Sequence, residues 1–319
     1  MMTTPKNLIK WPWRTAFAAA VIWTATLSFI LVASALAAEN KFSIYSGAEL
    51  ADASANLDVG YVPTPMEIVN EMFSLSAVGP KDFLIDMGSG DGRFVITAAK
   101  RFGTRGLGVD LNPKLVALSK KYALAEGVAD RTEFLVQDIF LTDIQAADVV
   151  TMYLLPEVNL KLRPKLLGEL KPGARIVSHD YHMGDWRPDK TVLMEKITSE
   201  GDDGILYFWV VPAKVAGTWH WRVDLRGEGQ EFILELQQHY QDISGTARNH
   251  GRQGPLFNAS LTGDRIRFSL ASEAEGRIIR QDYEGRVSRD AIEGMVKISG
   301  ATEEKQMKWQ AVRKAAPAK

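Results

Sequence analysis

One stretch of this chain limits its fold more than any other, residues 83–93, with the sequence FLIDMGSGDGR. Its first part is a short apolar run, which is typical of a strand buried on both faces. The run ends in glycines at alternate positions, Gly88, Gly90 and Gly92, and residues 94–101 then have a helical pattern. Because glycine has no Cβ, the backbone can turn sharply there and a ligand can approach closely. A strand, a glycine-rich turn and a helix open a doubly wound nucleotide-binding unit, so we predict an α/β fold.

The charges of this turn indicate the kind of ligand. A dinucleotide site has the pattern G-x-G-x-x-G and holds a pyrophosphate at the start of the following helix. Here Asp86 and Asp91 lie at the two ends of the turn, and carboxylates suit a ligand that lacks phosphates and carries an ammonium or sulfonium group. S-adenosylmethionine (SAM) has both cations, and a generic turn of an α/β protein is the alternative. The predicted cofactor contacts of the turn are Asp86, Gly88, Ser89, Gly90, Asp91 and Gly92.

A further acidic residue ends the next predicted strand. Residues 106–110 form a short segment, GLGVD, that ends in Asp110. In a doubly wound fold, an acid about twenty residues past the glycine turn holds the ribose hydroxyls of the cofactor. We therefore expect Asp110 to bind the ribose.

The glycine turn resembles motif I of the class I SAM-dependent methyltransferases. Its form D-x-G-S-G-D-G-R also resembles a narrower group, the bacterial relatives of the mitochondrial protein-lysine methyltransferases. In that group the segment Y-x-P-T-P, here residues 61–65, precedes motif I and borders the cofactor pocket. The resemblance covers residues 61–212 and implies that Asp138 bonds the adenine amino group while Ile139 lies against the ring. A strand-end cap is the alternative role for Asp138, and a simple helix start is the alternative for residues 61–65.

The predicted acceptor side lies at the ends of the fourth and fifth strands. Residues 153–156, Tyr-Leu-Leu-Pro, lack the N-P-P-Y of many methyltransferases that act on bases or glutamine, which argues against those acceptors. A lysine nucleophile must be neutral, so a desolvating aromatic pocket or a nearby carboxylate helps the reaction. The candidate catalytic residues are Tyr61, Tyr153 and Asp180. We expect His179 and His182 to line the substrate rim with Asp180 rather than to bind a metal.

Bulk composition excludes several classes of protein. The net charge of −1 gives no electrostatic case for nucleic-acid binding. The chain has no cysteine, which excludes disulfides, cysteine-ligated zinc and thiol catalysis.

The N-terminal residues have the pattern of an export signal. Basic residues precede an apolar run at residues 16–32, and Ala35 and Ala37 form a small-residue cleavage pattern. Residues 1–38 are thus predicted to be a signal peptide or a membrane anchor. The protein would be exported, periplasmic or secreted, or attached to the membrane through residues 16–38, and it would be cytoplasmic if the true start lies later. Export conflicts with the cofactor prediction, because SAM is made in the cytoplasm.

The pattern of apolar and polar residues changes after Pro212. Residues 214–319 show short alternating runs separated by glycine-containing turns, which predicts a small antiparallel β sandwich or barrel. We expect this part to shape or cover the substrate site. Binding of an apolar ligand or of a partner protein is the alternative.

Together these features predict an N-terminal hydrophobic segment, a doubly wound Rossmann-like methyltransferase domain at residues 39–213 and a β-rich domain at residues 214–319. The expected reaction is methyl transfer from SAM to an acceptor, an amine such as a protein lysine. One alternative is an exported binding protein that keeps the fold without catalysis. Another is a small-molecule or lipid methyltransferase at the membrane.

Overall fold

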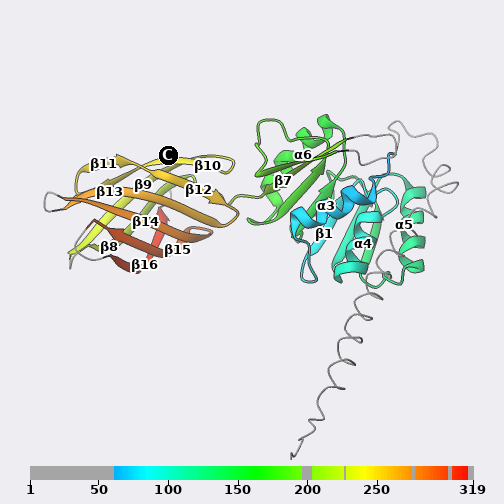
Figure 1. Cartoon of the computed structure of the whole chain (residues 1–319), viewed down its shortest axis with the longest axis horizontal. Coiled ribbons are helices and arrows are strands. Elements are labelled where there is room, and N and C mark those ends of the chain that lie inside the picture. Colours follow the sequence, from blue (N-terminus) through cyan, green and yellow to red (C-terminus); the bar gives the residue numbers. More distant parts are fainter. Residues whose placement is uncertain (1–60, 196–202, 226–227, 275–276, 301–303, 315–319) are drawn as a thin grey trace, which may run out of the picture. The chain divides into compact units, whose positions relative to one another are not determined.

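The computed structural model describes residues 61–195, 203–225, 228–274, 277–300 and 304–314 (Figure 1). The predicted signal peptide or anchor at residues 1–38 lies outside these ranges. Within the described ranges, no helix combines the length and the apolar character needed to cross a bilayer.

The first sheet has seven strands in the order β3-β2-β1-β4-β5-β7-β6. Strands β1 to β5 pair in parallel, whereas β7 and β6 join antiparallel at one end. The bounds are Phe83–Met87 (β1), Arg105–Asp110 (β2), Thr132–Val136 (β3), Val149–Met152 (β4), Arg175–His179 (β5), Lys190–Met194 (β6) and Gly204–Val210 (β7). The strand order reverses between β1 and β4, and such a switch point is where open α/β sheets bind ligands. The predicted doubly wound α/β fold is confirmed.

The helices of this part connect the parallel strands. Their bounds are Met66–Ser76 (α3), Arg93–Phe102 (α4), Pro113–Ala125 (α5) and Pro156–Glu169 (α6). Helix α5 begins where the side chain of Asn112 accepts a hydrogen bond from the amide of Lys114, with Pro113 in the first turn. The links β1–α4–β2 and β4–α6–β5 run in opposite directions from the switch point. Since such crossovers are right-handed, helices cover both faces of the sheet.

The core of the first sheet consists of apolar residues from its central strands. All four residues of β4 are buried, and Ile85, Val150 and Ile176 have no exposed surface. Trp209 of β7 is also fully buried, and its indole donates a hydrogen bond to the carbonyl of Trp186. The short apolar runs of the sequence therefore predicted these strands correctly, because their side chains are buried on both faces. Strand β6 could not be predicted in this way, because its residues are mostly exposed and lack a continuous apolar run.

The second sheet has nine antiparallel strands in the order β11-β10-β9-β8-β16-β15-β14-β13-β12 (Figure 1). Their bounds are Gly217–Leu225 (β8), Glu228–His239 (β9), Asp242–Asn249 (β10), Arg252–Pro255 (β11), Phe257–Thr262 (β12), Arg265–Ala274 (β13), Arg277–Ser288 (β14), Ala291–Ser299 (β15) and Lys305–Lys314 (β16). Strand β10 contacts β12, so the sheet curls toward closure and is nearly barrel-like. The antiparallel β-rich part predicted for the C-terminal third is confirmed in this form.

Aromatic rings fill the inside of the curled sheet. The ring of Trp221 lies 5.3 Å from that of Phe232, 5.4 Å from Tyr283 and 5.7 Å from Trp309, centroid to centroid. Its indole donates a hydrogen bond to the hydroxyl of Tyr283, which donates in turn to the side chain of Gln281. Trp219, Trp221 and Trp309 are all buried and therefore belong to the core of this sheet.

Candidate active site

The glycine turn joins β1 to α4 through three left-handed residues. The φ angles are 77° at Gly88, 53° at Gly90 and 79° at Gly92, a region that side chains disfavour. The amides of Gly88 and Ser89 both donate to the carbonyl of Val109 at 2.9 Å, which ties the turn to β2. The turn therefore requires glycine because of its backbone conformation, as the sequence predicted.

Tyr61 lies directly on this turn. A Cβ atom built on Gly90 would lie 2.1 Å from the ring of Tyr61, so only glycine leaves room for that ring. The hydroxyl of Tyr61 accepts a hydrogen bond from the amide of Asp91 at 3.3 Å. Burial raises the pKa of Tyr61 well above its usual range, and the nearby charge of Asp91 adds to the effect. Tyr61 is thus a neutral group that covers the turn.

Asp110 meets the turn from the end of β2. Its Oδ2 accepts a hydrogen bond from the amide of Gly90 at 2.9 Å, and its Oδ1 accepts one from the amide of Asn112 at 2.9 Å. The carboxylate therefore lies at the carboxyl edge of the sheet, between the glycine turn and the start of α5. This is the place that the sequence analysis predicted for the ribose-binding acid.

Asp86 is the buried carboxyl group of the turn. It is 2% exposed, and the hydroxyl of Thr151 on β4 donates a hydrogen bond to it at 2.7 Å. The pKa of Asp86 is raised to about 8, chiefly by burial and also by the charges of Asp110 and Asp91, while the hydrogen bond from Thr151 opposes the rise. A cationic ligand beside this group would favour its ionised form.

Asp91 has a protein partner that the sequence analysis did not predict. Its carboxylate accepts hydrogen bonds from Arg93 at 2.9 Å (Nε) and 2.6 Å (Nη2), and both residues are buried. Arg93 also donates to the carbonyl of Thr64, which ties the segment before α3 to the turn. Pro65, and not Thr64, occupies the cap position of α3, and no side chain forms a capping hydrogen bond there. The charge of Asp91 is thus compensated within the protein.

Tyr153 and Asp180 come together at the ends of β4 and β5. The pairing of Met152 with Ser178 places the next two residues, Tyr153 and His179, side by side. Their rings lie 4.1 Å apart, and the ring of Tyr181 stacks on Tyr153 at 6.1 Å. Burial raises the pKa of Tyr153 to about 12, and the charge of Asp180 contributes. We call Tyr153, His179 and Tyr181 the aromatic group. Of the three candidate catalytic residues, Tyr61 contacts the glycine turn, whereas Tyr153 and Asp180 lie at the aromatic group.

The backbone of Asp180 is held in an unusual conformation. Its φ angle is 61°, which is uncommon for a residue other than glycine. Its amide donates to the carbonyl of Ile205 at 2.7 Å, and its Oδ1 accepts from the amide of Ile205 at 3.0 Å. Two bonds to β7 therefore maintain the strained backbone, a feature that recurs at functional sites.

His179 lies beneath Tyr153 rather than at the rim that the sequence analysis predicted for it. It is 3% exposed, and its Nε2 lies 3.5 Å from Oδ1 of Asp180. Burial lowers the pKa of His179, and the charge of Asp180 opposes this shift. The prediction failed because His179 is the last residue of β5 and its side chain packs inward, against the neighbouring strand.

Asp138 and Ile139 follow β3. The carboxylate of Asp138 accepts a hydrogen bond from the amide of Phe140 at 2.8 Å, and its carbonyl accepts one from the hydroxyl of Thr142 at 2.9 Å. Ile139 packs partly buried against the core of the first sheet. These contacts give Asp138 the strand-end role that was its alternative, and its contact with adenine stays a prediction.

Two polar residues of this region were missed in the sequence. Thr151 bonds Asp86, and Asn159 of α6 lies fully buried beside the end of β5. A signal existed for Asn159, since it is a polar residue within a helix whose buried face is otherwise leucine, Leu162 and Leu166. Thr151 gave no signal, because threonine is common in strands.

The turn and its surroundings fit SAM. Asp86 is a buried carboxyl that an ammonium or sulfonium group can pair with, and Asp110 stands at the strand end for the ribose. A Cβ atom on Gly88 would lie 2.8 Å from the side chain of Leu154, so the absence of a side chain at Gly88 leaves room for Leu154 beside the turn. The hydroxyl of Ser89 is buried without a hydrogen-bond partner in the protein. These features suit a cationic ligand with several polar groups.

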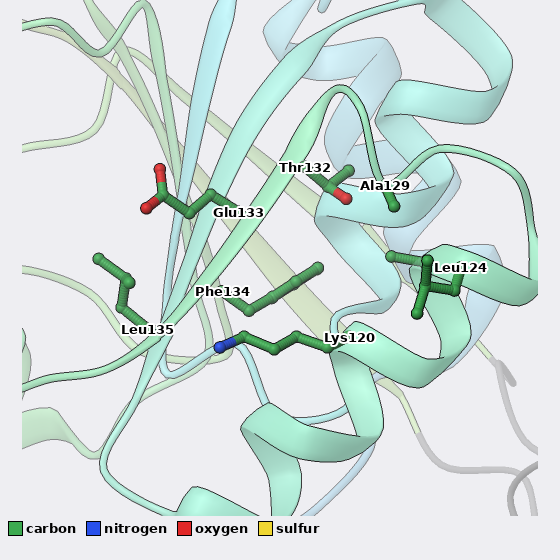
Figure 2. Close-up of a pocket in the computed structure, with 8 residues that line it drawn as sticks. Lys120, Leu124, Ala129, Thr132, Glu133, Phe134 and Leu135 are labelled. Atoms are coloured by element: carbon green, nitrogen blue, oxygen red, sulfur yellow. The ribbon is translucent and has the colours of Figure 1, made fainter.

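A separate depression of about 310 Å³ lies between α5 and the edge strand β3. Figure 2 shows Lys120 and Leu124 on the helix side and Thr132, Glu133, Phe134 and Leu135 on the strand side. None of the predicted site residues lines it. One lining residue, Phe134, also lies against the glycine turn, since a Cβ atom built on Gly92 would be 2.7 Å from its ring.

The comparisons with known proteins agree with this geometry. A family model described as the ANTKMT methyltransferase domain matches residues 86–190. A protein-lysine N-methyltransferase of Saccharolobus islandicus (strain REY15A) is 41% identical over 138 residues, which cover 43% of this chain and 86% of that protein. The adenine nucleotide translocase lysine N-methyltransferase of Mus musculus is 31% identical over 174 residues, which cover 54% of this chain and 66% of that protein.

A solved structure is similar over about the same share of the chain. The RNA methyltransferase of Salinibacter ruber, in complex with S-adenosyl-L-homocysteine, is 48% identical with a TM-score of 0.45. The alignment covers 48% of this chain and 96% of that one.

Proposed function

Because the chain belongs to the family of class I SAM-dependent protein-lysine methyltransferases, we propose that it transfers a methyl group from SAM to a lysine side chain of a protein. It is a methyltransferase, and SAM is its cofactor. The observation that supports lysine as the acceptor is the aromatic group of Tyr153, His179 and Tyr181 beside the carboxylate of Asp180. Relatives named as lysine methyltransferases support the same acceptor.

The cofactor half of the site is assigned to the glycine turn and its neighbours. Gly88 and Gly90 shape the turn against Leu154 and Tyr61, Asp110 would bond the ribose, and Asp86 would pair with positive charge. Asp138 and Ile139 would bind the adenine. When bound, SAM supplies a methyl group on a sulfonium, which is already activated for transfer to a nucleophile. The protein then has to position the acceptor and exclude water.

The acceptor half is assigned to the ends of β4 and β5. The rings of Tyr153 and Tyr181 exclude water from the amine, which favours its neutral, nucleophilic form. Asp180 would accept a hydrogen bond from the amine N–H, and this bond would direct the nitrogen lone pair. Tyr61, on the glycine turn, would separate the cofactor from solvent. The position of each side chain supports the role proposed for it, and each role can be tested separately.

The remaining divisions of the chain are also proposals. Residues 39–213 would form the catalytic domain and residues 214–319 a separate β domain, which is supported by the distinct apolar core of each sheet. The basic and apolar pattern of residues 1–38 supports an export signal or an anchor, and with it an exported or membrane-attached protein.

Methyl transfer to a protein extract tests the acceptor. The full chain is incubated with SAM labelled in the methyl group and with extract, either untreated or with its lysines acetylated. We expect labelled methyl-lysine after acid hydrolysis of the untreated extract and none from the acetylated one. The Asp110→Ala variant should lose the signal, and Asp130→Ala, which removes an exposed carboxylate paired with Arg131, should keep it. Label that survives acetylation, or that appears in lipid or small molecules, would contradict a lysine acceptor.

A further inference from the structure

Asn159 is a buried polar residue that neither half of the proposed site uses. It lies on α6 and has no exposed surface. Its Nδ2 donates hydrogen bonds to the hydroxyl of Ser178 at 3.2 Å and to the carbonyl of Tyr181 at 3.0 Å. The hydroxyl of Ser178 donates to the same carbonyl at 2.7 Å. One backbone carbonyl, that of Tyr181, is thus held by two side chains from two different elements.

This carbonyl lies in the short segment that carries the aromatic group. The segment leaves β5 through Asp180, whose strained backbone is fixed to β7 at Ile205. The amide of Tyr181 donates to the carbonyl of His179 at 2.8 Å. Bonds from Asn159 and Ser178 therefore complete a set that fixes both ends of the segment.

The position of the Tyr181 ring depends on this segment. That ring stacks on Tyr153 with an interplanar angle of 15°, and Tyr153 in turn packs on His179. Tyr153 is only partly buried, and one of the groups that cover its ring is the stacked ring of Tyr181. A free carbonyl at position 181 would leave the ring without a fixed backbone.

Burying an amide side chain is costly unless its polar atoms are bonded, and within the described residues the Nδ2 of Asn159 has partners while its Oδ1 has none. At position 159 an apolar residue would pack on the buried face of α6 in the same way as Leu162 and Leu166. Stabilisation of α6 therefore does not explain Asn159, whose donor group is directed to the rim segment instead.

We propose that Asn159 is a positioning residue that holds the Tyr181 carbonyl and thereby sets the ring pair that receives the acceptor amine. The inference rests on the proposed function in taking these rings as the acceptor site. Asn159 does not contact the acceptor itself. It acts through Tyr181, and Ser178 assists it.

The test uses Asn159→Leu, which keeps the size of the side chain and removes both hydrogen bonds. The matched control is Ser76→Ala, a buried polar residue whose hydroxyl bonds the carbonyl of Met72 within its own helix. Because the rings of Tyr153 and His179 pack at 4.1 Å, the ring protons of His179 carry a ring-current shift. Histidine-selective NMR of the full chain reads this shift without any acceptor, and a His179→Gln sample assigns the signal.

We expect Asn159→Leu to move the His179 signals toward the positions of an unstacked histidine and Ser76→Ala to leave them in place. With the protein extract as acceptor, Asn159→Leu should slow methyl transfer roughly 10- to 100-fold through misplacement of the rings. Its dissociation constant for SAM, from calorimetry, should stay within about twofold of the wild type. A purely structural role would weaken SAM binding as well.

Unchanged His179 signals together with an unchanged rate in Asn159→Leu would overturn the proposal, as would an equal loss of SAM affinity. If Asn159→Leu does not fold, Ser178→Ala removes one bond to the same carbonyl with little change in volume, and the same signals are read. If the wild-type chain labels no lysine, the proposed function fails, while the NMR signals still decide whether Asn159 holds the rings.

Discussion

The hydroxyl of Thr151 donates a hydrogen bond to the carboxyl of Asp86 at 2.7 Å, across the neighbouring strands β4 and β1. Both residues are buried, with 0% and 2% of their surface exposed. Asp86 is the first residue of the motif that identifies the chain as a methyltransferase. Its ionisation therefore depends on a residue outside the motif, and the proposed pairing of Asp86 with the positive charge of SAM would depend on that residue too.

Replacing Thr151 with valine should weaken SAM binding. The change keeps the shape of the side chain and removes the donor that lowers the pKa of Asp86, so the carboxyl group becomes harder to ionise. A hydrogen bond to a charged group contributes about 1.5–3 kcal/mol, so we expect roughly a tenfold or greater rise in the dissociation constant for SAM. Calorimetry at pH 7.5 measures it. Thr97→Val is the control, since Thr97 is also buried but its hydroxyl has no hydrogen-bond partner in the protein.

The stability of the chain should carry a pH dependence that comes from Asp86. The unfolded group ionises at its usual pKa of 3.8, whereas the folded group ionises only at about 8. The unfolded state thus loses its proton first, and the contribution of this group to stability is complete below pH 3.8 and declines until about pH 8. Asn is neutral throughout, so the unfolding free energy of the wild type minus that of Asp86→Asn should fall as the pH rises through this window. Urea unfolding at several pH values measures the difference, and a flat or rising difference would contradict the raised pKa.

Gly90→Ala should weaken SAM binding by more than the backbone strain of an alanine at positive φ can account for. The new Cβ would lie 2.1 Å from the ring of Tyr61 and would displace it from the turn. Gly127→Ala is the matched control, because its φ of 70° imposes the same backbone strain with no atom within 4 Å of the new Cβ. We expect the control to lose about 1 kcal/mol of stability and to bind SAM normally. Gly90→Ala should lose SAM binding in a calorimetric titration. Normal binding would show that the affinity for SAM does not depend on the position of Tyr61 at the turn.

Tyr283→Phe should destabilise the C-terminal sheet and leave cofactor binding unchanged. The hydroxyl accepts a hydrogen bond from Trp221 and donates one to Gln281, all three residues being buried. Its removal leaves two buried polar groups without a partner, at a cost of about 1–3 kcal/mol. Thermal unfolding measures the loss, and calorimetry with SAM should give the wild-type affinity. Tyr240→Phe, which removes a hydroxyl bonded to Asp185 near the surface, is the control. A loss of SAM affinity in Tyr283→Phe would contradict the proposal that the two domains are stable independently of each other.

Much of the fold follows from local patterns. Buried strands such as β1 and β4 are continuous apolar runs, and the glycines of the turn occur where side chains are excluded by the backbone. The sequence analysis missed β10 and β11, because polar residues dominate both strands and give no apolar alternation. It also placed His179 at an exposed rim, since the direction of a side chain at a strand end is set by the neighbouring strand.

The order of residues was enough to specify the family, the glycine turn and the acid at the end of β2. These depend on backbone conformation and on short spacings, which are local properties of the chain. The tertiary structure alone decides which side chains far apart in the sequence come into contact. Asp86 and Thr151 are 65 residues apart, and Asn159 and Tyr181 are 22 apart. Parallel strand pairing and helix packing bring these groups together, and most buried polar groups are stabilised by partners that the fold supplies in this way.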